Sequence, residues 1–499
     1  MKTMEMFNRK KLATALSMAL ALAGAAHAAG DLKHDDRAVV VDHDPSIFSA
    51  DPTHEDRPYS VEEQLKIYGD KKANVNPRPL VEHGRRVYDV GVFPEPSYIF
   101  GRKNPVEQQF LVYGDWRTAV ASNDFGNTDT QVLATRLNLD LDWKLTATER
   151  VHAIVTPLQD GNQFTRYVFG GNAESHGAKG EFDPNLDALF LEGDLGAIAA
   201  GFSDQYNKHD IPFAIGLMPL FLQNGVWMDD AFIGAAVAIP ARNSAALGIS
   251  NYDISFFAGF DEVTTNLGVP GGGQAGVNIF GATAFLEANE GYWELGYAYS
   301  EVEEASSQNY HNVTGAFTRR YGGRISNSVR VIGNFGQESR PGVPRTADGA
   351  LFLVENSLIT HLPSTLIPYL NVFYGIDTPQ SVARAAGAGG VLKNTGILFE
   401  TDGLTGFPTL DATGNNTYGG AIGVQYLFAL NQQVVVEAAM VEPHDGSANS
   451  AAGGSQWGLG VRWQRPLDRS WIVRADAMYG SRENRADVSG VRLEIRRKF

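Results

Sequence analysis

The chain has 499 residues, with 57 Asp and Glu against 41 Lys and Arg, and a formal net charge of −16. No basic stripe interrupts this acidic balance, which argues against nucleic acid as a partner. Cysteine is absent, which excludes disulfides, thiolate metal sites, iron–sulfur clusters and covalently attached haem.

The N-terminus has the layout of a secretory signal peptide. Four basic residues within the first eleven precede an apolar run from Leu12 to Ala26, and a small-x-small site ends at Ala28. Such a segment is removed during export, so we expect residues 1–28 to be cleaved. After it, no stretch of about 18 apolar residues remains to form a membrane helix.

Residues 29–105 differ from the rest of the chain because they are rich in Pro, Asp and His. Three clusters pair imidazole with carboxylates: His34 to Asp36, Asp42 to Asp44 and His54 to Asp56. These groups can bind Zn²⁺, Cu²⁺ or Ni²⁺, but their spacing matches no defined metal site. We therefore interpret this part as a mostly irregular, solvated acidic segment in the periplasm, and expect no metal and no cofactor.

From Val106 onward the chain is a series of segments with period-two alternation, split by turn signals. The clearest is Thr130 to Leu145, where six large apolar residues from Leu133 to Leu145 share one face and charged or amide residues share the other. Aromatic residues fall near the ends of such segments. This pattern is typical of barrel strands that turn an apolar face to lipid and a polar face to the lumen.

The connections between these segments alternate in length. Short turns such as 146–148 and 289–290 alternate with longer polar loops such as 261–277 and 377–416. Counting strands between them predicts an all-β, transmembrane, antiparallel up-and-down barrel of about 18 strands over residues 106–499. Sixteen strands stay an alternative, because the segments Leu186–Glu192 and Ala197–Ser203 are weak.

The connection 204–242 is long, apolar and interrupted by proline. It is the third long connection and resembles in position the third loop of general and anion-selective porins, which folds into the lumen and narrows it. This resemblance implies a constriction at Phe213, Trp227, Asp229 and Asp230. The alternative is that Ala231–Ile239 and Ala241–Ile249 form another hairpin around Pro240, because connections as long as 204–242 without secondary structure are uncommon.

Strand parity predicts which charged side chains face the lumen. Arginines and carboxylates on different walls would set a transverse field, and their net sign would bias ion passage. Residues 455–499 carry ten basic and five acidic side chains, which predicts one basic wall. The alternative is that these charges only fill and hydrate the lumen. The predicted pore-lining residues are Arg117, Arg136, Asp140, Asp142, Arg330, Glu437, Arg462, Arg474, Asp476, Arg492 and Glu494, with Lys144, Glu294 and Arg496 on the same face.

No catalytic constellation can be assembled from the sequence. The histidines are scattered, and the Gly-Ser sequences near Ser447 and Ser455 lie in loops rather than in nucleophile elbows. We therefore expect that the protein is not an enzyme.

The last nine residues, Val491 to Phe499, alternate apolar and charged side chains and end in an aromatic residue. A terminal aromatic after such a strand resembles the assembly signal of bacterial outer-membrane barrels, although Arg497 stands where an apolar residue is usual. With the signal peptide, the strand rhythm and the long third connection, the chain resembles an outer-membrane porin. In size and layout it is similar to phosphate-selective porins and alginate-export-type barrels.

The resemblance implies a Gram-negative outer-membrane channel for passive or facilitated diffusion of small hydrophilic solutes, and the predicted basic wall would suit anionic or zwitterionic ones. Two alternatives stay open: an exporter of a polysaccharide or small molecule that works with periplasmic partners, and a structural barrel that binds a partner at the surface. Expected partners are outer-membrane lipid and lipopolysaccharide, and the barrel-assembly machinery. A homotrimer and a periplasmic partner of residues 29–105 are further hypotheses.

Overall fold

The structure is a computed structural model that describes residues 77–84, 99–101, 107–267, 276–303, 305–339, 345–363, 365–401, 403–428, 431–444, 446 and 450–499. The predicted signal peptide and the acidic, His-containing clusters lie outside these residues. Of the N-terminal segment, the short strand β1 (Val81–His83) is described.

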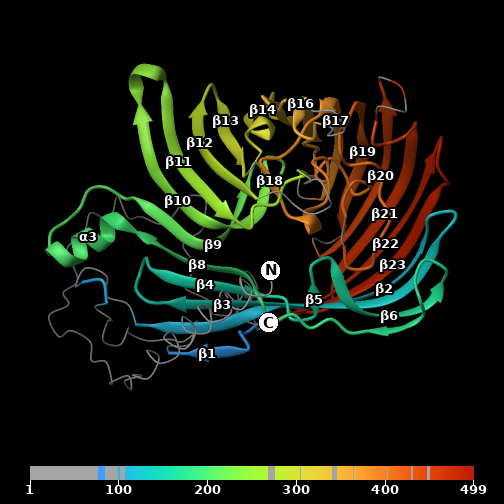
Figure 1. The fold of residues 1–499 in the computed structure, drawn as a ribbon, viewed down its shortest axis with the longest axis horizontal. Helices are drawn as coiled ribbons and strands as arrows, with labels where there is room; N and C mark the ends of the chain where they lie inside the picture. The colour runs from blue at the N-terminus through green and yellow to red at the C-terminus, as the bar shows by residue number, and fades with distance from the viewer. Residues whose placement is uncertain are drawn as a thin grey trace, which may run out of the picture.

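Eighteen antiparallel strands of the described residues close into one barrel (Figure 1), as the sequence predicts. Each strand pairs with the next, and the last, β23, pairs with the first, β2, from Asp124↔Ser489 to Asp115↔Lys498. Closure leaves no free sheet edge to lipid, which a membrane barrel requires. The strands are β2 (Gln109–Asp124), β3 (Asp129–Lys144), β4 (Arg150–Val155), β8 (Leu186–Asp194), β9 (Pro212–Leu222), β10 (Met228–Ser244), β11 (Ile249–Asp261), β12 (Val277–Ala288), β13 (Gly291–Val302), β14 (Tyr310–Tyr321), β15 (Ile325–Phe335), β16 (Asp348–Leu358), β17 (Leu366–Thr378), β19 (Thr417–Phe428), β20 (Gln432–Pro443), β21 (Gln456–Pro466), β22 (Trp471–Arg482) and β23 (Val488–Lys498).

Short elements complete the described chain. The connection between β4 and β8 contains β5 (Gln159–Asp160), β6 (Gln163–Gly171) and β7 (Gly177–Lys179). Of these, β6 pairs with Thr130 to Thr135 in the first half of β3. β18 (Ala383–Arg384) lies between β17 and β19, and the 3₁₀ turns are η1 (Ala245–Leu247), η2 (Ser306–Gln308) and η3 (Ala386–Ala388). None of the helices in the described residues is both long and apolar enough to cross a membrane.

The seam between β2 and β23 ends at Phe499. The Phe499 N–H donates to the Gly114 carbonyl (3.1 Å), and the Gly114 N–H donates to the Phe499 carbonyl (3.0 Å). Beyond this point β1 takes the place of β23 beside β2, with Val81 opposite Val112. We call the barrel end that holds Phe499 the terminus end, and the opposite one the loop end.

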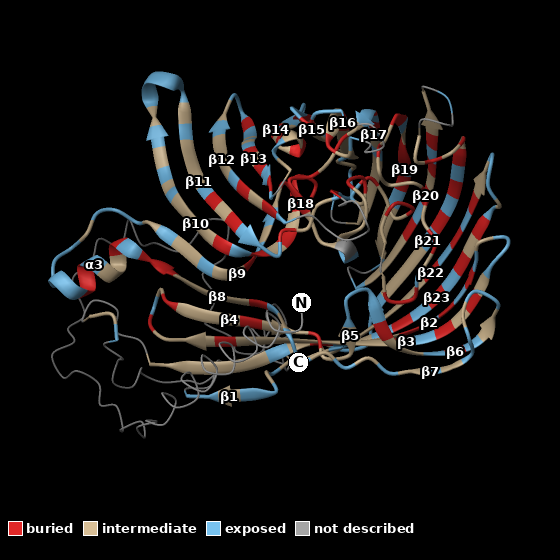
Figure 2. Ribbon diagram, in the orientation of Figure 1, coloured by how far each residue is buried: buried red, intermediate tan, exposed pale blue. Residues whose placement is uncertain are grey.

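Alternation along the strands follows the predicted parity. In β23, Val491, Leu493 and Ile495 are exposed on the outer face, whereas Arg492 and Glu494 are buried on the inner face. Figure 2 shows the same alternation of exposed and buried residues along β19 to β23. A wall with apolar side chains outside and charges inside suits lipid outside and water inside.

The predicted arrangement of residues 197–250 is wrong in detail, although the strand count is confirmed. Residues 195–203, predicted as a strand from Ala197, form the helix α3 (Leu195–Ser203). Helix formation is favoured because Asp194 caps it, its carboxylate accepting from the Ala197 N–H (2.7 Å). The predicted loop 204–242 is instead mostly the hairpin of β9 and β10.

The alternative hairpin around Pro240 is also wrong, because Pro240 lies within β10. The ladder to β11 shifts register between Ile239 and Arg242, and Ala241 has a positive φ of 53°. The Asp253 carboxylate accepts from the Ala241 N–H (2.6 Å). A bulge of this kind lets a strand accommodate a proline that cannot donate to the ladder.

Candidate pore and its lining

The tip of the β9–β10 hairpin turns into the barrel. β10 pairs with β11 from Ile233 onward, so Met228 to Phe232 extend past this neighbour. The tip reaches the inner faces of two more distant strands instead: the Thr314 hydroxyl of β14 donates to the Gln223 amide oxygen (2.8 Å), and the Gln223 amide donates to the Glu294 carbonyl of β13 (3.4 Å).

Trp227 fixes this inward turn. Its side chain is fully buried, and its indole N–H donates to the Asn312 amide oxygen of β14 (2.7 Å). Its ring packs edge-on against Phe257, with 6.1 Å between centroids. A buried tryptophan contributes a large apolar area, and the satisfied N–H removes the cost of burying it.

The connection 379–416 between β17 and β19, which we call the inner loop, runs across the lumen. At one side it pairs with the hairpin tip: β18 lies parallel to β10, with Met228 opposite Ala383. The Val382 N–H donates to the Trp227 carbonyl (2.8 Å), and the Lys393 ammonium pairs with the Asp229 carboxylate. The inner loop and the hairpin tip therefore form one inward-folded unit.

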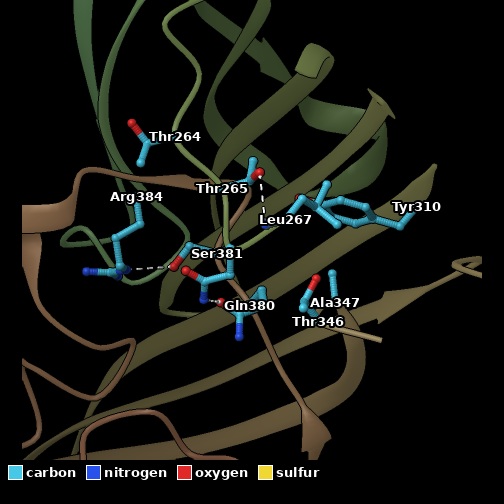
Figure 3. A pocket seen from close by; sticks show the side chains of 10 residues that line it. Thr264, Thr265, Leu267, Tyr310, Thr346, Ala347, Gln380, Ser381 and Arg384 are labelled. Atoms are coloured by element: carbon cyan, nitrogen blue, oxygen red, sulfur yellow. Dashed lines mark hydrogen bonds between the residues drawn. The ribbon is translucent and has the colours of Figure 1, made fainter. Parts of the chain in front are cut away.

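Figure 3 shows the polar cavity where this unit meets the connection between β11 and β12. The Arg384 guanidinium donates to the Ser381 hydroxyl (3.0 Å), and the Thr264 N–H donates to the Asp230 carboxylate (2.7 Å). The cavity measures about 10 Å³, room for about one water molecule. It is therefore a packed junction rather than the path of a solute.

At the other side the inner loop binds the wall through Glu437 of β20. The Ile397 and Leu398 N–H groups each donate to its carboxylate (2.9 Å each), and the Tyr369 hydroxyl of β17 donates to the same group. Glu437 is only 1% exposed. A buried carboxylate with three donors is a strong, directional anchor for the loop.

Glycines in the wall make room for apolar side chains of the inner loop. A Cβ at Gly460 of β21 would lie 3.0 Å from Leu398, and one at Gly490 of β23 would lie 2.8 Å from Pro408. Leu392, Leu398, Phe399 and Leu410 of the inner loop are buried in one cluster with residues of the wall. The main apolar core of this protein thus lies inside the barrel.

Three arginines form a row across adjacent strands of the inner face. Arg117 of β2 lies directly opposite Arg136 of β3 on one side and Arg496 of β23 on the other. The Asp115 carboxylate pairs with Arg117 (3.0 Å) and Arg496 (2.6 Å). No hydrogen bond or ion pair from the described residues reaches the Arg136 guanidinium, which lies 5.9 Å from the centre of the Phe164 ring. Like charges directly opposite in a sheet are destabilising.

The row continues into a second cluster around Asp476 of β22. Its carboxylate pairs with Arg462 (2.8 Å), Arg474 (2.8 Å) and Arg492 (2.7 Å). We call the six arginines of the row and the cluster the arginine wall. They are Arg136, Arg117, Arg496, Arg492, Arg474 and Arg462.

Glu400 of the inner loop faces this wall. It pairs with Arg462 at 2.7 Å and lies 3.6 Å from Arg474. Burial opposes its ionisation, but Arg462 and Arg474 outweigh burial, so the pKa of the Glu400 carboxyl lies below its usual value. Asp115, Asp476 and Glu494 are further carboxylates of this region, and Asp187 of β8 adds its charge at Arg136. Five carboxylates thus meet six guanidinium groups, and the wall keeps an excess of one positive charge.

On the opposite side of the barrel, two carboxylates lie near one guanidinium group. Arg330 of β15 is 2% exposed and pairs with Glu355 of β16 (3.0 Å), and Glu294 of β13 adds its charge to the field at Glu355. The arginine wall and this group lie on different strands of the barrel, an arrangement that orients the electric field across the lumen.

Comparison with solved structures finds β-barrels of Pseudomonas aeruginosa. OccK2 (OpdF) has a TM-score of 0.51 and 12% identity, with 78% of this chain and 97% of that chain covered. OpdK, solved with vanillate, has a TM-score of 0.50 and 14% identity, with 78% and 98% covered. No family model matches the sequence, and no curated protein matches it either.

At 12% and 14% identity, these two likenesses show the fold. This chain has a porin-type β-barrel fold. Its strand number and its closed antiparallel topology agree with the expectation from the sequence.

The porin-type barrel brings most of the predicted lining residues together but separates others. Arg117, Arg136, Arg462, Arg474, Asp476, Arg492 and Glu494 lie on five adjacent strands. Asp140 and Asp142 lie nearer the terminus end of β3, where Asp142 pairs with Arg150 (3.4 Å) and lies 3.9 Å from His152. Arg330 belongs to the opposite side, and Glu437 holds the inner loop. That these residues line an open pore stays a prediction.

The predicted constriction residues also separate. Trp227, Asp229 and Asp230 lie at the inward-turned tip, but Phe213 lies near the terminus end of β9, opposite Val237 on the outer face. Its predicted place at a constriction is therefore wrong. An aromatic residue there instead belongs to the lipid-facing band.

Sequence reasoning missed Lys393 and Glu400, which connect the inner loop to the hairpin tip and to the arginine wall. The loop was treated as a polar outer connection. The signal for an inward-folded loop is its large apolar residues, such as Leu392 and Leu398. A loop exposed to solvent rarely carries a cluster of such side chains.

Proposed function

We propose that the protein is an outer-membrane channel through which small hydrophilic solutes diffuse, with a preference for anions. The observation that carries this proposal is the row of Arg136, Arg117 and Arg496. Three like charges directly opposite one another cost stability, and Asp115 compensates only part of them. A positive strip that water reaches has a use in a pore, because it concentrates anions and replaces part of their hydration.

Water reaches this row. The side chains of Arg117 and Arg496 are 29% and 31% exposed, and that of Glu400 is 36% exposed. Side chains exposed to this degree are in contact with solvent, which supports a wet passage between the inner loop and the wall. The vanillate in the OpdK structure is a carboxylate, and a solute with such a group suits the same chemistry.

Single-channel recording in a planar bilayer tests the proposal. The refolded protein should give discrete ohmic steps, and the reversal potential in a KCl gradient should have the sign of anion preference. Arg136→Gln should reduce that preference while conductance persists. The matched control is Arg497→Gln, because Arg497 stacks on Trp471 on the outer face, 5.5 Å from the ring centre.

The possible results separate the parts of the proposal. A folded, heat-modifiable protein without conductance would refute an open channel. Conductance with a preference for cations would refute the proposed anion preference but would still support an open channel. An equal change in reversal potential in Arg136→Gln and Arg497→Gln would show that the arginine row does not set the ion preference.

A further inference from the structure

The connection between β8 and β9 is unlike its neighbours at the terminus end. Other connections there are tight turns, such as the two residues Asn289 and Glu290 between β12 and β13. This one contains the helix α3, which Figure 1 shows outside the ring of strands. Neither the lumen nor the arginine wall involves it.

The faces of α3 are the reverse of those of a surface helix in water. Its nine residues include no charged side chain, and its buried residues are Gly196, Ala200 and Gly201. Leu195 and Phe202, which share the opposite face at helical spacing, are 47% and 69% exposed. A helix in contact with water places polar residues on its outer face, so this outer face is suited to an apolar medium.

The small residues bring α3 close to the protein backbone. A Cβ at Gly201 would lie 2.0 Å from the Phe100 carbonyl oxygen, and one at Gly196 would lie 1.7 Å from the His209 carbonyl oxygen. Close backbone approach fixes the orientation of the helix. The large apolar side chains are thereby held outward, and none of the described residues covers Phe202.

The next strand in the chain, β9, also turns apolar side chains outward. α3 leads into β9, whose outer face carries Phe213 and the 52% exposed Ile215. Tyr206, just after the helix, is 86% exposed. Apolar side chains flanked by a tyrosine at the rim of a barrel are the composition of a membrane–water interface.

We propose that α3 is an interfacial anchor that lies in the phospholipid leaflet at the terminus end of the barrel. Leu195 and Phe202 enter the boundary between headgroups and acyl chains, and Tyr206 lies at headgroup level. Helices that bind in this plane gain affinity in proportion to their buried apolar area. The occupant of this surface is therefore lipid, and the anchor holds the β8–β9 rim at a fixed depth.

The absence of cysteine makes a site-directed labelling test direct. Phe202→Cys carries a nitroxide in protein reconstituted into vesicles of phosphatidylethanolamine with a minor fraction of phosphatidylglycerol. Collision with oxygen, which concentrates in lipid, is compared with collision with a water-soluble nickel chelate. Ile215→Cys is the lipid-facing reference, and Gln205→Cys, at an exposed polar position, is the water-facing reference.

The proposal predicts that the label at residue 202 resembles the one at residue 215, with high oxygen and low nickel accessibility. A label that resembles the one at residue 205 would overturn the proposal, because the helix would then stand in water. A label that neither reagent reaches would also overturn it, because protein would then cover the face. All three variants leave the lumen unchanged, so the result does not depend on whether the channel conducts.

Discussion

Glu437 holds the inner loop inside the barrel, and its removal should release that loop. Glu437→Ala removes a buried carboxylate that accepts the Ile397 and Leu398 N–H groups at 2.9 Å each. A hydrogen bond to a charged group contributes about 1.5–3 kcal/mol, so the two amides together account for about 3–6 kcal/mol of loop docking. The Tyr369 hydroxyl loses its acceptor as well.

This energy converts into an observable opening of the loop. At about 1.4 kcal/mol per factor of ten, a loss of about 3–6 kcal/mol raises the undocked fraction by about 10² to 10⁴. Amide hydrogen exchange should therefore accelerate by that factor at residues 397 and 398, up to the limit set by the fully open loop. Single-channel currents should become larger and noisier, because the loop no longer occupies a fixed part of the lumen.

The control for this experiment is Glu442→Ala. Glu442 lies on the same strand, β20, but its carboxylate pairs with the Ser455 hydroxyl and makes no described contact with the inner loop. Unchanged exchange at residues 397 and 398 in Glu437→Ala would refute the anchoring role. If the alanine variant does not fold, Glu437→Gln keeps one side-chain oxygen as acceptor and should give a smaller acceleration of the same amides.

Three further outcomes follow from the lumen. Trp227→Ala should lower the free energy of unfolding by about 3–5 kcal/mol in urea titrations, because it removes a fully buried side chain and leaves the Asn312 amide without its donor; a loss below about 1 kcal/mol would contradict the fixed hairpin tip. Gly490→Val should push Pro408 off the wall, since a Cβ there would lie 2.8 Å from it, and limited proteolysis should then cut the inner loop. The pKa of Glu400 is lowered, so its attraction to the arginine wall is fully present above the usual glutamate pKa and is lost as pH falls through the lower folded value. Channel noise should therefore rise in that acidic range. A current record that does not change with pH, or the same acid response in Glu400→Gln, would contradict this assignment.

The sequence predicted the wall well and the lumen poorly, for a physical reason. Wall strands alternate between lipid and water, so their pattern is local and can be counted. β3 was predicted within one residue at each end, as Thr130–Leu145 against Asp129–Lys144. The inner loop contacts the wall at positions far away in the chain, such as Glu437 with Ile397. No period in the sequence records such contacts.

The errors around residues 197–250 have the same origin. α3 has no charged side chain and is apolar apart from Ser203, so without knowledge of its surroundings its residues fit a strand as well as a helix. At their tip, β9 and β10 stay paired with each other, but β10 no longer pairs with β11. The tip packs on the inner faces of β13 and β14 instead, so both of its faces carry apolar residues. Strand patterns are recognisable only where the two faces meet different environments.

The two inward-folded segments also explain why the lumen tolerates its arginines. Guanidinium groups buried without partners would be expensive, and the wall strands alone provide Asp115, Asp187, Asp476 and Glu494 for six of them. The inner loop adds Glu400, and its apolar residues dock on the same strands at Gly460 and Gly490. The loop thus offsets part of the cost of burying Arg462 and Arg474 in the arginine wall. A variant that frees the inner loop should therefore lower the free energy of unfolding and also raise the anion preference of the channel. A variant that changes one of these quantities without the other would refute the coupling between the inner loop and the arginine wall.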